Sequence, residues 1–459
     1  MICAAKPRKN QGKGAGEFGR WFARTAIAAA VLAVSLPAAA MTLSEAFERA
    51  KAHDPSIAVA DAQYAADREL SSAVRGERLP SLSVGGKYQY AKTESNGVFG
   101  QSEDEYPSWS AQVVARQPLF RLDWFALGDR AQALDEQADI TFRNAQLDVL
   151  RRVAERYFGV LLAQDELAQA EAETKAVRES LDDTQKRYDV ELVPGMDLKE
   201  AQARDDLSRA RLLAARTSLQ TSRDALDEIT GNGNVELPQL PEDVAFPPLS
   251  PASPDAWVQA ARAQSPRIAL AAKAAIVAAT DRKSAQSVGL PQLDLVASAG
   301  RDDTSDYDFG QETDDARIGV ELNIPLYAGG VNAANLRKAE ANAIAAEANL
   351  KRVTLETERE TRQLYRQVET AYYESEAYKK SLESAQLAER AVAAGYDAGT
   401  RTITDVLDAK SRVVQARRDL NRTRYQMLQS LIQLKQLTGE LSEKDFAEID
   451  QLLSYPPAH

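Results

Sequence analysis

The stretch RIGVELNIP, residues 317–325, is the most informative about the fold. In it apolar and polar side chains alternate until Pro325 ends the run, and the apolar set is Ile318, Val320, Leu322 and Ile324. Successive side chains of a β-strand point to opposite faces, so this pattern predicts a strand with one apolar and one polar face. Residues 109–116, WSAQVVAR, alternate in the same way. Such strands suit either a membrane sheet or a soluble sheet with one buried face.

Each stretch belongs to a predicted β-hairpin, about residues 81–117 and 292–324, and both hairpins are bracketed by prolines. These are Pro80, Pro118, Pro291 and Pro325. Proline cannot donate to a strand ladder, so pairing should stop where strand meets helix. The second hairpin has a strongly acidic tip, made of Asp302, Asp303, Asp306, Asp308, Glu312, Asp314 and Asp315. A tip of this kind belongs in water beyond a membrane, which favours the membrane interpretation.

The chain contains an internal repeat. Tyr188-Asp189 recurs as Tyr396-Asp397, and residues 79–82 (LPSL) recur as residues 290–293 (LPQL). A near-constant offset of this kind predicts two copies of one architecture. We expect repeats at residues 41–240 and 254–445, a linker at 241–253 and a C-terminal tail at 446–459. Each repeat should hold a helix (42–76; 254–286), the hairpin, a long helix (122–189; 330–395) and a further helix (197–229; 403–437).

The predicted long helices are exceptional in length. No proline lies between Pro118 and Pro194, or between Pro325 and Pro456. A helix of ~65 residues at 1.5 Å per residue spans ~100 Å. The second one carries a heptad seam, consisting of Leu364, Val368, Ala371, Ser375, Tyr378, Leu382 and Ala385. Such a seam predicts packing of the long helices as a coiled coil.

The N-terminus is typical of an export signal. A basic region precedes the apolar run at residues 26–36, and small residues follow at 37–40. This pattern predicts a signal peptide at residues 1–40. Its removal takes away the only cysteine, Cys3, together with six basic residues and one acid, so the formal charge moves from -12 to about -17. Such an acidic chain should not bind nucleic acid.

Composition gives no support for catalysis. Beyond the signal the chain has two histidines, His53 and His459, and neither lies near a cluster of potential metal ligands. No glycine-rich phosphate loop follows a strand. We therefore expect no enzyme activity, no metal and no cofactor.

No later segment has the ~18 apolar residues of a membrane-spanning helix. Entry into a membrane would then require a β-barrel. Four strands are too few, because spanning barrels need about eight, so several copies must join around an axis.

The end of the second long helix carries a family resemblance. Residues 396–409, YDAGTRTITDVLDA, resemble the periplasmic tip of the TolC-type outer-membrane factors, and the repeat and the strand-end prolines extend the resemblance over the mature chain. The resemblance implies a mixed α and β membrane protein. In it a long coiled-coil α-helical barrel would be continuous with a transmembrane β-barrel formed by a homotrimer, with four strands per chain. Its place would be the outer membrane of a Gram-negative bacterium, extending into the periplasm.

The resemblance also implies a function and partners. The trimer would be the channel-tunnel of a tripartite export system, docked on a periplasmic adaptor protein and an inner-membrane ABC or RND transporter. Its cargo would be proteins, as in type I secretion, or small molecules, as in multidrug efflux. The rival interpretation is a periplasmic coiled-coil scaffold that conducts nothing.

Site residues follow from the same resemblance. Asp197, Tyr396 and Arg401 would be gate links that hold the tunnel closed, and Asp405 and Asp408 would line its narrowest point. Adaptor docking would involve Leu192, Val193, Gly399, Thr400, Arg401 and Thr402. The i, i+3 spacing puts Asp405 and Asp408 on one helix face, where a ring of them would attract cations. Acids also suit a helix N-terminus, which is the plain alternative.

One turn departs from the family pattern. The first-repeat turn has Glu191 where the family usually has glycine, and Met196 where it usually has a small hydroxyl residue. Together with Pro194 these residues put adaptor docking and one gate link on that side in doubt.

Overall fold

The computed structural model describes residues 40–97, 100–231, 236–241, 244–304 and 311–453. The predicted signal peptide lies outside this part of the chain, apart from Ala40. Two of the acidic hairpin-tip residues, Asp306 and Asp308, lie outside it as well.

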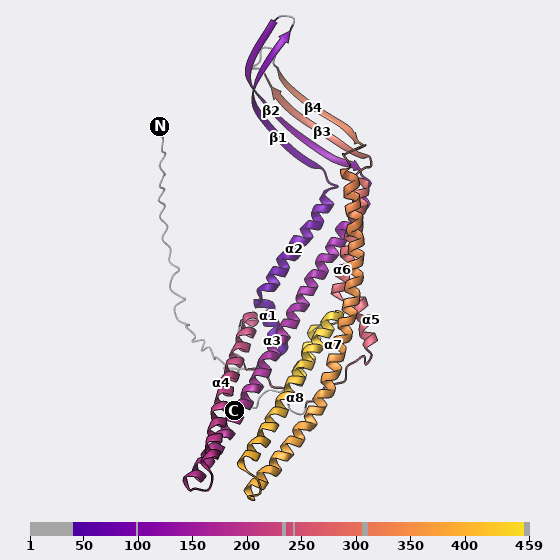
Figure 1. The fold of residues 1–459 in the computed structure, drawn as a ribbon. Helices are drawn as coiled ribbons and strands as arrows, with labels where there is room; N and C mark the ends of the chain where they lie inside the picture. Colours follow the sequence, from indigo (N-terminus) through magenta and orange to yellow (C-terminus); the bar gives the residue numbers. More distant parts are fainter. Residues whose placement is uncertain (1–39, 98–99, 232–235, 242–243, 305–310, 454–459) are drawn as a thin grey trace, which may run out of the picture. The chain divides into compact units, whose positions relative to one another are not determined.

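The same order of elements occurs twice along the chain (Figure 1). The first set is α1 (Leu43–His53), α2 (Pro55–Gly76), β1 (Ser81–Gly97), β2 (Gly100–Phe120), α3 (Trp124–Asp189) and α4 (Gly195–Thr230). The second set is α5 (Pro254–Gln264), α6 (Pro266–Ser287), β3 (Gln292–Asp303), β4 (Glu312–Asn323), α7 (Val331–Asp397) and α8 (Ile403–Thr438). A short helix, α9 (Glu443–Leu452), follows; it begins at the end of the expected second repeat and continues into the segment expected only as a tail.

The first helix of each set is two helices, where the sequence predicted one. Asp54 separates α1 from α2, and its side chain accepts a hydrogen bond from the backbone N–H of Ser56 at 2.8 Å. Ser265 separates α5 from α6 at the corresponding position, without a side-chain capping bond. Pro55 and Pro266 come next in each case, and proline disfavours helical backbone in the residue before it while suiting the first position of a helix. The X-Pro steps therefore break both helices.

The four strands form one antiparallel sheet in the order β1-β2-β3-β4 (Figure 1). The pairing of β2 with β3 joins the two hairpins. In the register Val84 is opposite Val113, Val113 is opposite Ala299, and Leu295 is opposite Val320. The apolar positions of all four strands therefore share one face.

The opposite face of the sheet is polar. Arg116 of β2 forms ion pairs with Asp294 of β3 at 2.8 Å and with Glu321 of β4 at 3.0 Å. A sheet with one apolar and one charged face fits a boundary between a nonpolar and an aqueous medium.

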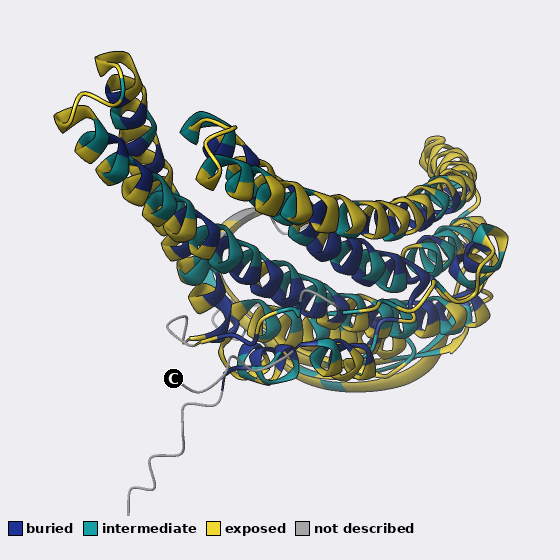
Figure 2. Cartoon of the chain, turned by 90° about the horizontal axis from the view of Figure 1, so that it is seen from below, coloured by how far each residue is buried: buried dark blue, intermediate teal, exposed yellow. Residues whose placement is uncertain are grey.

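Two helical hairpins lie at the end opposite to the sheet. One is made of α3 and α4, and the other of α7 and α8 (Figure 1). The long helices α3 and α7 have 66 and 67 residues. Figure 2 shows buried residues mainly where helices pack together, and exposed residues along the remaining surface. None of the described helices is both long and apolar enough to cross a membrane.

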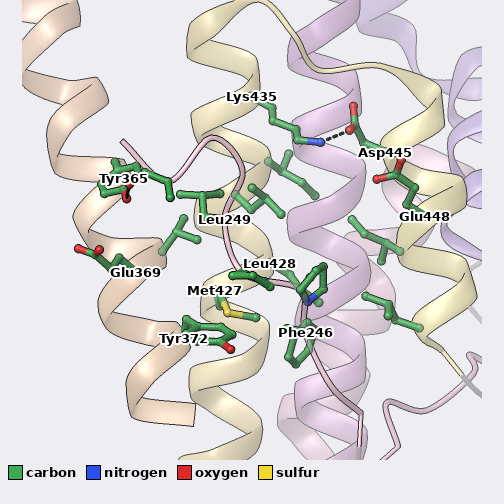
Figure 3. A pocket seen from close by; sticks show the side chains of 18 of the residues that line it. Phe246, Leu249, Tyr365, Glu369, Tyr372, Met427, Leu428, Lys435, Asp445 and Glu448 are labelled. Atoms are coloured by element: carbon green, nitrogen blue, oxygen red, sulfur yellow. Dashed lines mark hydrogen bonds and ion pairs between the residues drawn. The ribbon is translucent and has the colours of Figure 1, made fainter. Parts of the chain in front are cut away.

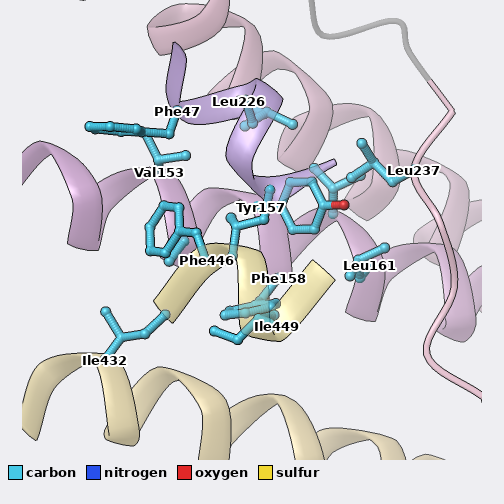
Figure 4. Packing of buried hydrophobic residues seen from close by; sticks show 14 of the residues in the cluster. Phe47, Val153, Tyr157, Phe158, Leu161, Leu226, Leu237, Ile432, Phe446 and Ile449 are labelled. Atoms are coloured by element: carbon cyan, nitrogen blue, oxygen red, sulfur yellow. The ribbon is translucent and has the colours of Figure 1, made fainter. Parts of the chain in front are cut away.

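The largest core lies where α1, α3, α8 and α9 meet (Figure 4). Phe446 of α9 packs edge-to-face on Phe47 of α1, with ring centroids 5.8 Å apart. The hydroxyl of Tyr157, on α3, donates to the carbonyl of Met41 at 2.9 Å. This core fixes α9 and the start of the described chain against the middle of α3.

The linker between the two sets crosses α7 and α8. Tyr365 of α7 donates from its hydroxyl to the carbonyl of Ala252 at 2.8 Å, and Arg424 of α8 donates to the carbonyl of Pro241 at 3.1 Å. An apolar hollow of about 540 Å³ lies beside the linker, with the Lys435–Asp445 ion pair at its edge (Figure 3). These bonds hold the linker on the second helical hairpin.

Candidate functional site at the helical tips

Two turns end the helical hairpins, one after α3 and one after α7. In the second turn Gly399 has a φ of 73°, and the N–H of Thr400 donates to the carbonyl of Gly395 at 2.8 Å. This is the left-handed closure that glycine permits at a helix C-terminus. In the first turn Glu191 takes up a φ of 61°, a conformation that costs an L-residue roughly 1–2 kcal/mol. The side chain of Glu191 therefore sits on a strained backbone.

The residues expected to dock an adaptor are at these turns and are largely exposed. Leu192 is 73 % exposed, and Met196 beside it is 79 % exposed. Val193 is half-buried, while Gly399, Thr400, Arg401 and Thr402 are exposed. The first tip thus presents apolar side chains, and the second presents hydroxyls and a guanidinium.

Tyr396 bonds to a residue that sequence reasoning missed. Its hydroxyl donates to a carboxylate oxygen of Asp183, on α3, at 3.0 Å. Arg187 forms an ion pair with Asp183 at 2.9 Å, and its guanidinium carbon lies 5.0 Å from the centre of the Tyr396 ring. Burial and the bond to Asp183 raise the pKa of Tyr396. This cluster joins the two helical hairpins within one chain.

Asp197, which the family resemblance gives as the partner of Tyr396 and Arg401 on the neighbouring helix pair, lies elsewhere in the tip. It is exposed in the first turn of α4, and no side-chain bond connects it with Tyr396 or Arg401 among the described residues. The only sequence signal for Asp183 was its i, i+4 spacing to Arg187 on α3, which says nothing of Tyr396.

Arg401 packs on the end of α7. A Cβ built on Gly395 would lie 2.8 Å from the Cγ of Arg401, so the arginine stem occupies the space that glycine leaves. The guanidinium also acts on Asp405, whose pKa it helps to lower.

Asp405 caps the helix on which it lies. Its carboxylate accepts hydrogen bonds from the backbone N–H and the hydroxyl of Thr402, both at 2.9 Å, and Thr402 in turn caps the N–H of Asp405. The backbone bond from Thr402 is the main reason that the pKa of Asp405 is lowered. Such a reciprocal capping box stabilises the start of α8. Within a single chain, Asp405 therefore stabilises the N-terminus of α8, which is the role that the plain alternative gives to an acid at this position.

Asp408 has a different environment. Arg204 of α4 donates to its carboxylate at 3.0 Å, and the other amino group of Arg204 bonds to Glu200 at 2.9 Å. Asp408 and Arg204 line a cavity of about 600 Å³ between the two hairpins, and Asp405 does not. The two acids therefore have different partners despite their i, i+3 spacing.

Sequence reasoning also missed Arg204 as a partner of Asp408. Its repeat relation to Arg412 was visible in the sequence, but the contact across the two hairpins was not. No group of three or more potential metal ligands occurs in the described part of the chain.

Comparison with known proteins decides the family. The model of the outer membrane efflux protein family matches residues 46–232 and 257–440. The chain belongs to the outer membrane efflux protein family. The two matched segments fall one on each set of elements. The resemblance to TolC-type factors is therefore confirmed.

Individual relatives agree. The efflux protein is 32% identical over 430 residues to the outer membrane protein TolC of Vibrio cholerae, covering 92% of this chain and 96% of that one. It is 28% identical over 418 residues to the alkaline protease secretion protein AprF of Pseudomonas aeruginosa, covering 88% and 86%.

Solved structures show the same fold. The outer membrane protein VceC from Vibrio cholerae superimposes with a TM-score of 0.74 at 19% identity, covering 86% of this chain and 96% of that one. The CmeC outer membrane channel of Campylobacter jejuni superimposes with a TM-score of 0.73 at 17% identity, covering 90% of each chain. The family match and the relatives of known sequence identify the chain as an outer-membrane channel protein that extends into the periplasm, as predicted.

Proposed function

We propose that three copies of the chain form one continuous duct, which conducts cargo passively from an inner-membrane transporter to the cell exterior. The observation that carries this proposal is the sheet, with its apolar face, its charged face and two open edges at β1 and β4. An open strand edge in a membrane leaves backbone groups without partners. Pairing β4 of one copy with β1 of the next closes the sheet into a barrel without edges.

The helical half of each copy would continue this wall through the periplasm. The tip residues at 192–193 and 399–402 would then meet a periplasmic adaptor, which couples the duct to an ABC or RND transporter. Relatives named for protease secretion and for efflux both match most of the chain, which supports cargo of either class.

A gate at the tips belongs to this proposal. Asp197 and Arg401 are both exposed in one chain, so they are free to bond between neighbouring copies. Tyr396 contributes within a copy, through Asp183. Asp405 and Asp408 would surround the lumen near the tip. Exposed pairs are worth ~0–1 kcal/mol each, so three repeats would hold a tip that a docked adaptor can still open.

The duct and its gate are tested together in planar bilayers. Arg401→Ala and Asp197→Ala should raise single-channel conductance, because each removes one side of the latch. Arg216→Ala is the matched control, since Arg216 pairs with Glu171 inside the first hairpin at 3.3 Å. Unchanged conductance in both tip variants would refute the latch. A purified protein that forms no channel would refute the duct itself.

Cargo is tested in a Gram-negative host that lacks its own outer-membrane efflux protein. Restored release of a type I secreted protein would assign protein export, and restored resistance to a lipophilic drug would assign efflux. Restoration of neither would contradict the tripartite role.

A further inference from the structure

One arginine holds two carboxylates at the junction of the two helical hairpins. Arg204, on α4, bonds to Glu200 of its own helix at 2.9 Å and to Asp408 of α8 at 3.0 Å. Its side chain is 30 % exposed, and that of Asp408 is 52 % exposed. The contact spans 204 residues of sequence, so it ties the first hairpin to the second.

The internal repeat gives Asp408 a second potential partner. Glu200 corresponds to Asp408, and Arg204 corresponds to Arg412, each pair at the same offset along the chain. An acid four residues before a base on a helix is within reach of it, as Glu200 and Arg204 show. Arg412 therefore has the spacing to bind Asp408 on its own helix.

Arg412 is available for that role. It is exposed on α8, and no ion pair joins it to any residue in the described part of the chain. Asp408 is thus flanked by two arginines, one across the cavity and bonded, the other on its own helix.

We infer that Asp408 is an exchange carboxylate, bonded to Arg204 of the first hairpin when the tip is closed and to Arg412 of its own helix when the hairpins separate. This inference rests on the proposed gate and names the residues that regulate it. The exchange keeps Asp408 paired in both states. Because each exposed pair is worth only ~0–1 kcal/mol, the two states differ little in free energy, and a docked partner can shift the balance.

The surrounding charges are compatible with such an exchange. Arg211, Lys410 and Arg417 line the same cavity as Asp408, together with Glu173 and Glu389. Glu173 already pairs with Arg211 within the first hairpin at 2.9 Å. Lys410 and Arg417 lie on α8 itself, so they move with Asp408 and cannot tie it to the first hairpin.

The inference also changes the expected charge of the constriction. Bound by Arg204, Asp408 carries little net charge toward the lumen in the closed state. When the hairpins part, the guanidinium of Arg204 leaves with the first hairpin. Arg412 then takes its place beside Asp408, so cation attraction at the constriction should rest on Asp405 in both states.

The test measures the separation of the hairpins directly. Spin labels on cysteines introduced at Leu213 of α4 and Gln415 of α8, both exposed, report the distance by pulsed electron paramagnetic resonance. The only native cysteine, Cys3, lies in the predicted signal peptide, so the labels are unambiguous in the mature protein.

Two variants should shift the distances in opposite directions. Arg204→Gln should increase the fraction of molecules with a long distance between the labels about threefold, and Arg412→Gln should decrease that fraction about threefold. A change of this size is expected for the loss of one exposed ion pair. Arg216→Gln, the matched control within the first hairpin, should leave the distances unchanged. Single-channel open probability should follow the same order in bilayers.

The outcomes distinguish a failure of this inference from a failure of the proposed duct. A channel that conducts while Arg412→Gln leaves the distances unchanged overturns the exchange, and so does a shift of both variants in the same direction. A protein that forms no pore overturns the proposed duct instead. The label distances report on the exchange in that case as well.

Discussion

Among single residues, Asp165 connects the two repeats in an unusual electrostatic setting. This half-buried carboxylate of α3 accepts hydrogen bonds from the amide of Asn421 at 2.8 Å and from the hydroxyl of Tyr425 at 3.0 Å, both on α8. Burial raises the pKa of Asp165 to about 6, although both bonds favour the ionised form. Burial and the nearby carboxylate likewise raise the pKa of Tyr425. The ionised acid is therefore held where desolvation penalises it.

The raised pKa of Asp165 gives a signed prediction. Between its ordinary value near 4 and about 6, the folded state binds more protons at this group than the unfolded state does. Its contribution to the free energy of unfolding therefore falls as pH rises through that window and is fully present only below it. Asp165→Asn should remove this dependence, a difference of about 2 kcal/mol between pH 4 and pH 7.

Denaturant titrations of the wild type and Asp165→Asn at the two pH values measure the difference. Asp224→Asn, on the exposed face of α4, serves as the control and should keep the wild-type pH dependence. Equal pH dependence in all three proteins would contradict the assignment to Asp165.

Among the elements, the sheet shows most clearly how alternation along a strand produces one apolar face and one polar face. β3 lies between β2 and β4, so both its edges are paired with neighbouring strands. Ala297 lies opposite Ala115 and Ile318 on the apolar face, and Ser298 lies opposite Val114 and Arg317 on the other face. Adjacent residues of one strand therefore meet different surroundings.

These two residues give a matched pair of variants. Ala297→Lys places a charge on the proposed lipid face. It should lower the free energy of unfolding in lipid vesicles by roughly 2–4 kcal/mol. Ser298→Lys adds the same charge on the proposed lumen face and should change little. Urea titrations of the protein in lipid vesicles compare them. An equal cost for both variants would be incompatible with a single lipid face.

In the whole molecule, large apolar side chains remain uncovered in the single chain where strands meet helices. Leu326 is 93 % exposed, and Phe125 and Tyr327 are each 86 % exposed. Uncovered apolar surface of this size marks a contact with another molecule. We assign this surface to contacts with neighbouring copies in the proposed trimer.

Removing one such side chain should weaken the assembly. Burying a leucine fully is worth about 1.5–3 kcal/mol, and the change occurs once per copy. Leu326→Ser should therefore lower the fraction of trimer in detergent, whereas Leu326→Met should retain it. Sedimentation or native mass spectrometry gives the stoichiometry. A trimer equally stable in both variants would place this surface against lipid instead.

Local signals in the sequence were sufficient to predict the long helices, the strands and their order, but not the short helix α9. Alternation along residues 317–324, the bracketing prolines and the long proline-free stretches each specify backbone conformation within a few turns. The family resemblance at residues 396–409 then placed the tips and the sheet in one known architecture.

Which side chains contact each other became clear from the packing of the helices. Tyr396 bonds to Asp183 rather than Asp197, and Asp408 bonds to Arg204, across 213 and 204 residues of sequence. Those contacts depend on how two helices of nearly seventy residues are rotated and displaced against each other. A heptad pattern defines which face of a helix is apolar, but not which turn of its partner that face meets. The partners of the proposed gate residues are therefore set by packing between distant segments, which no local pattern encodes.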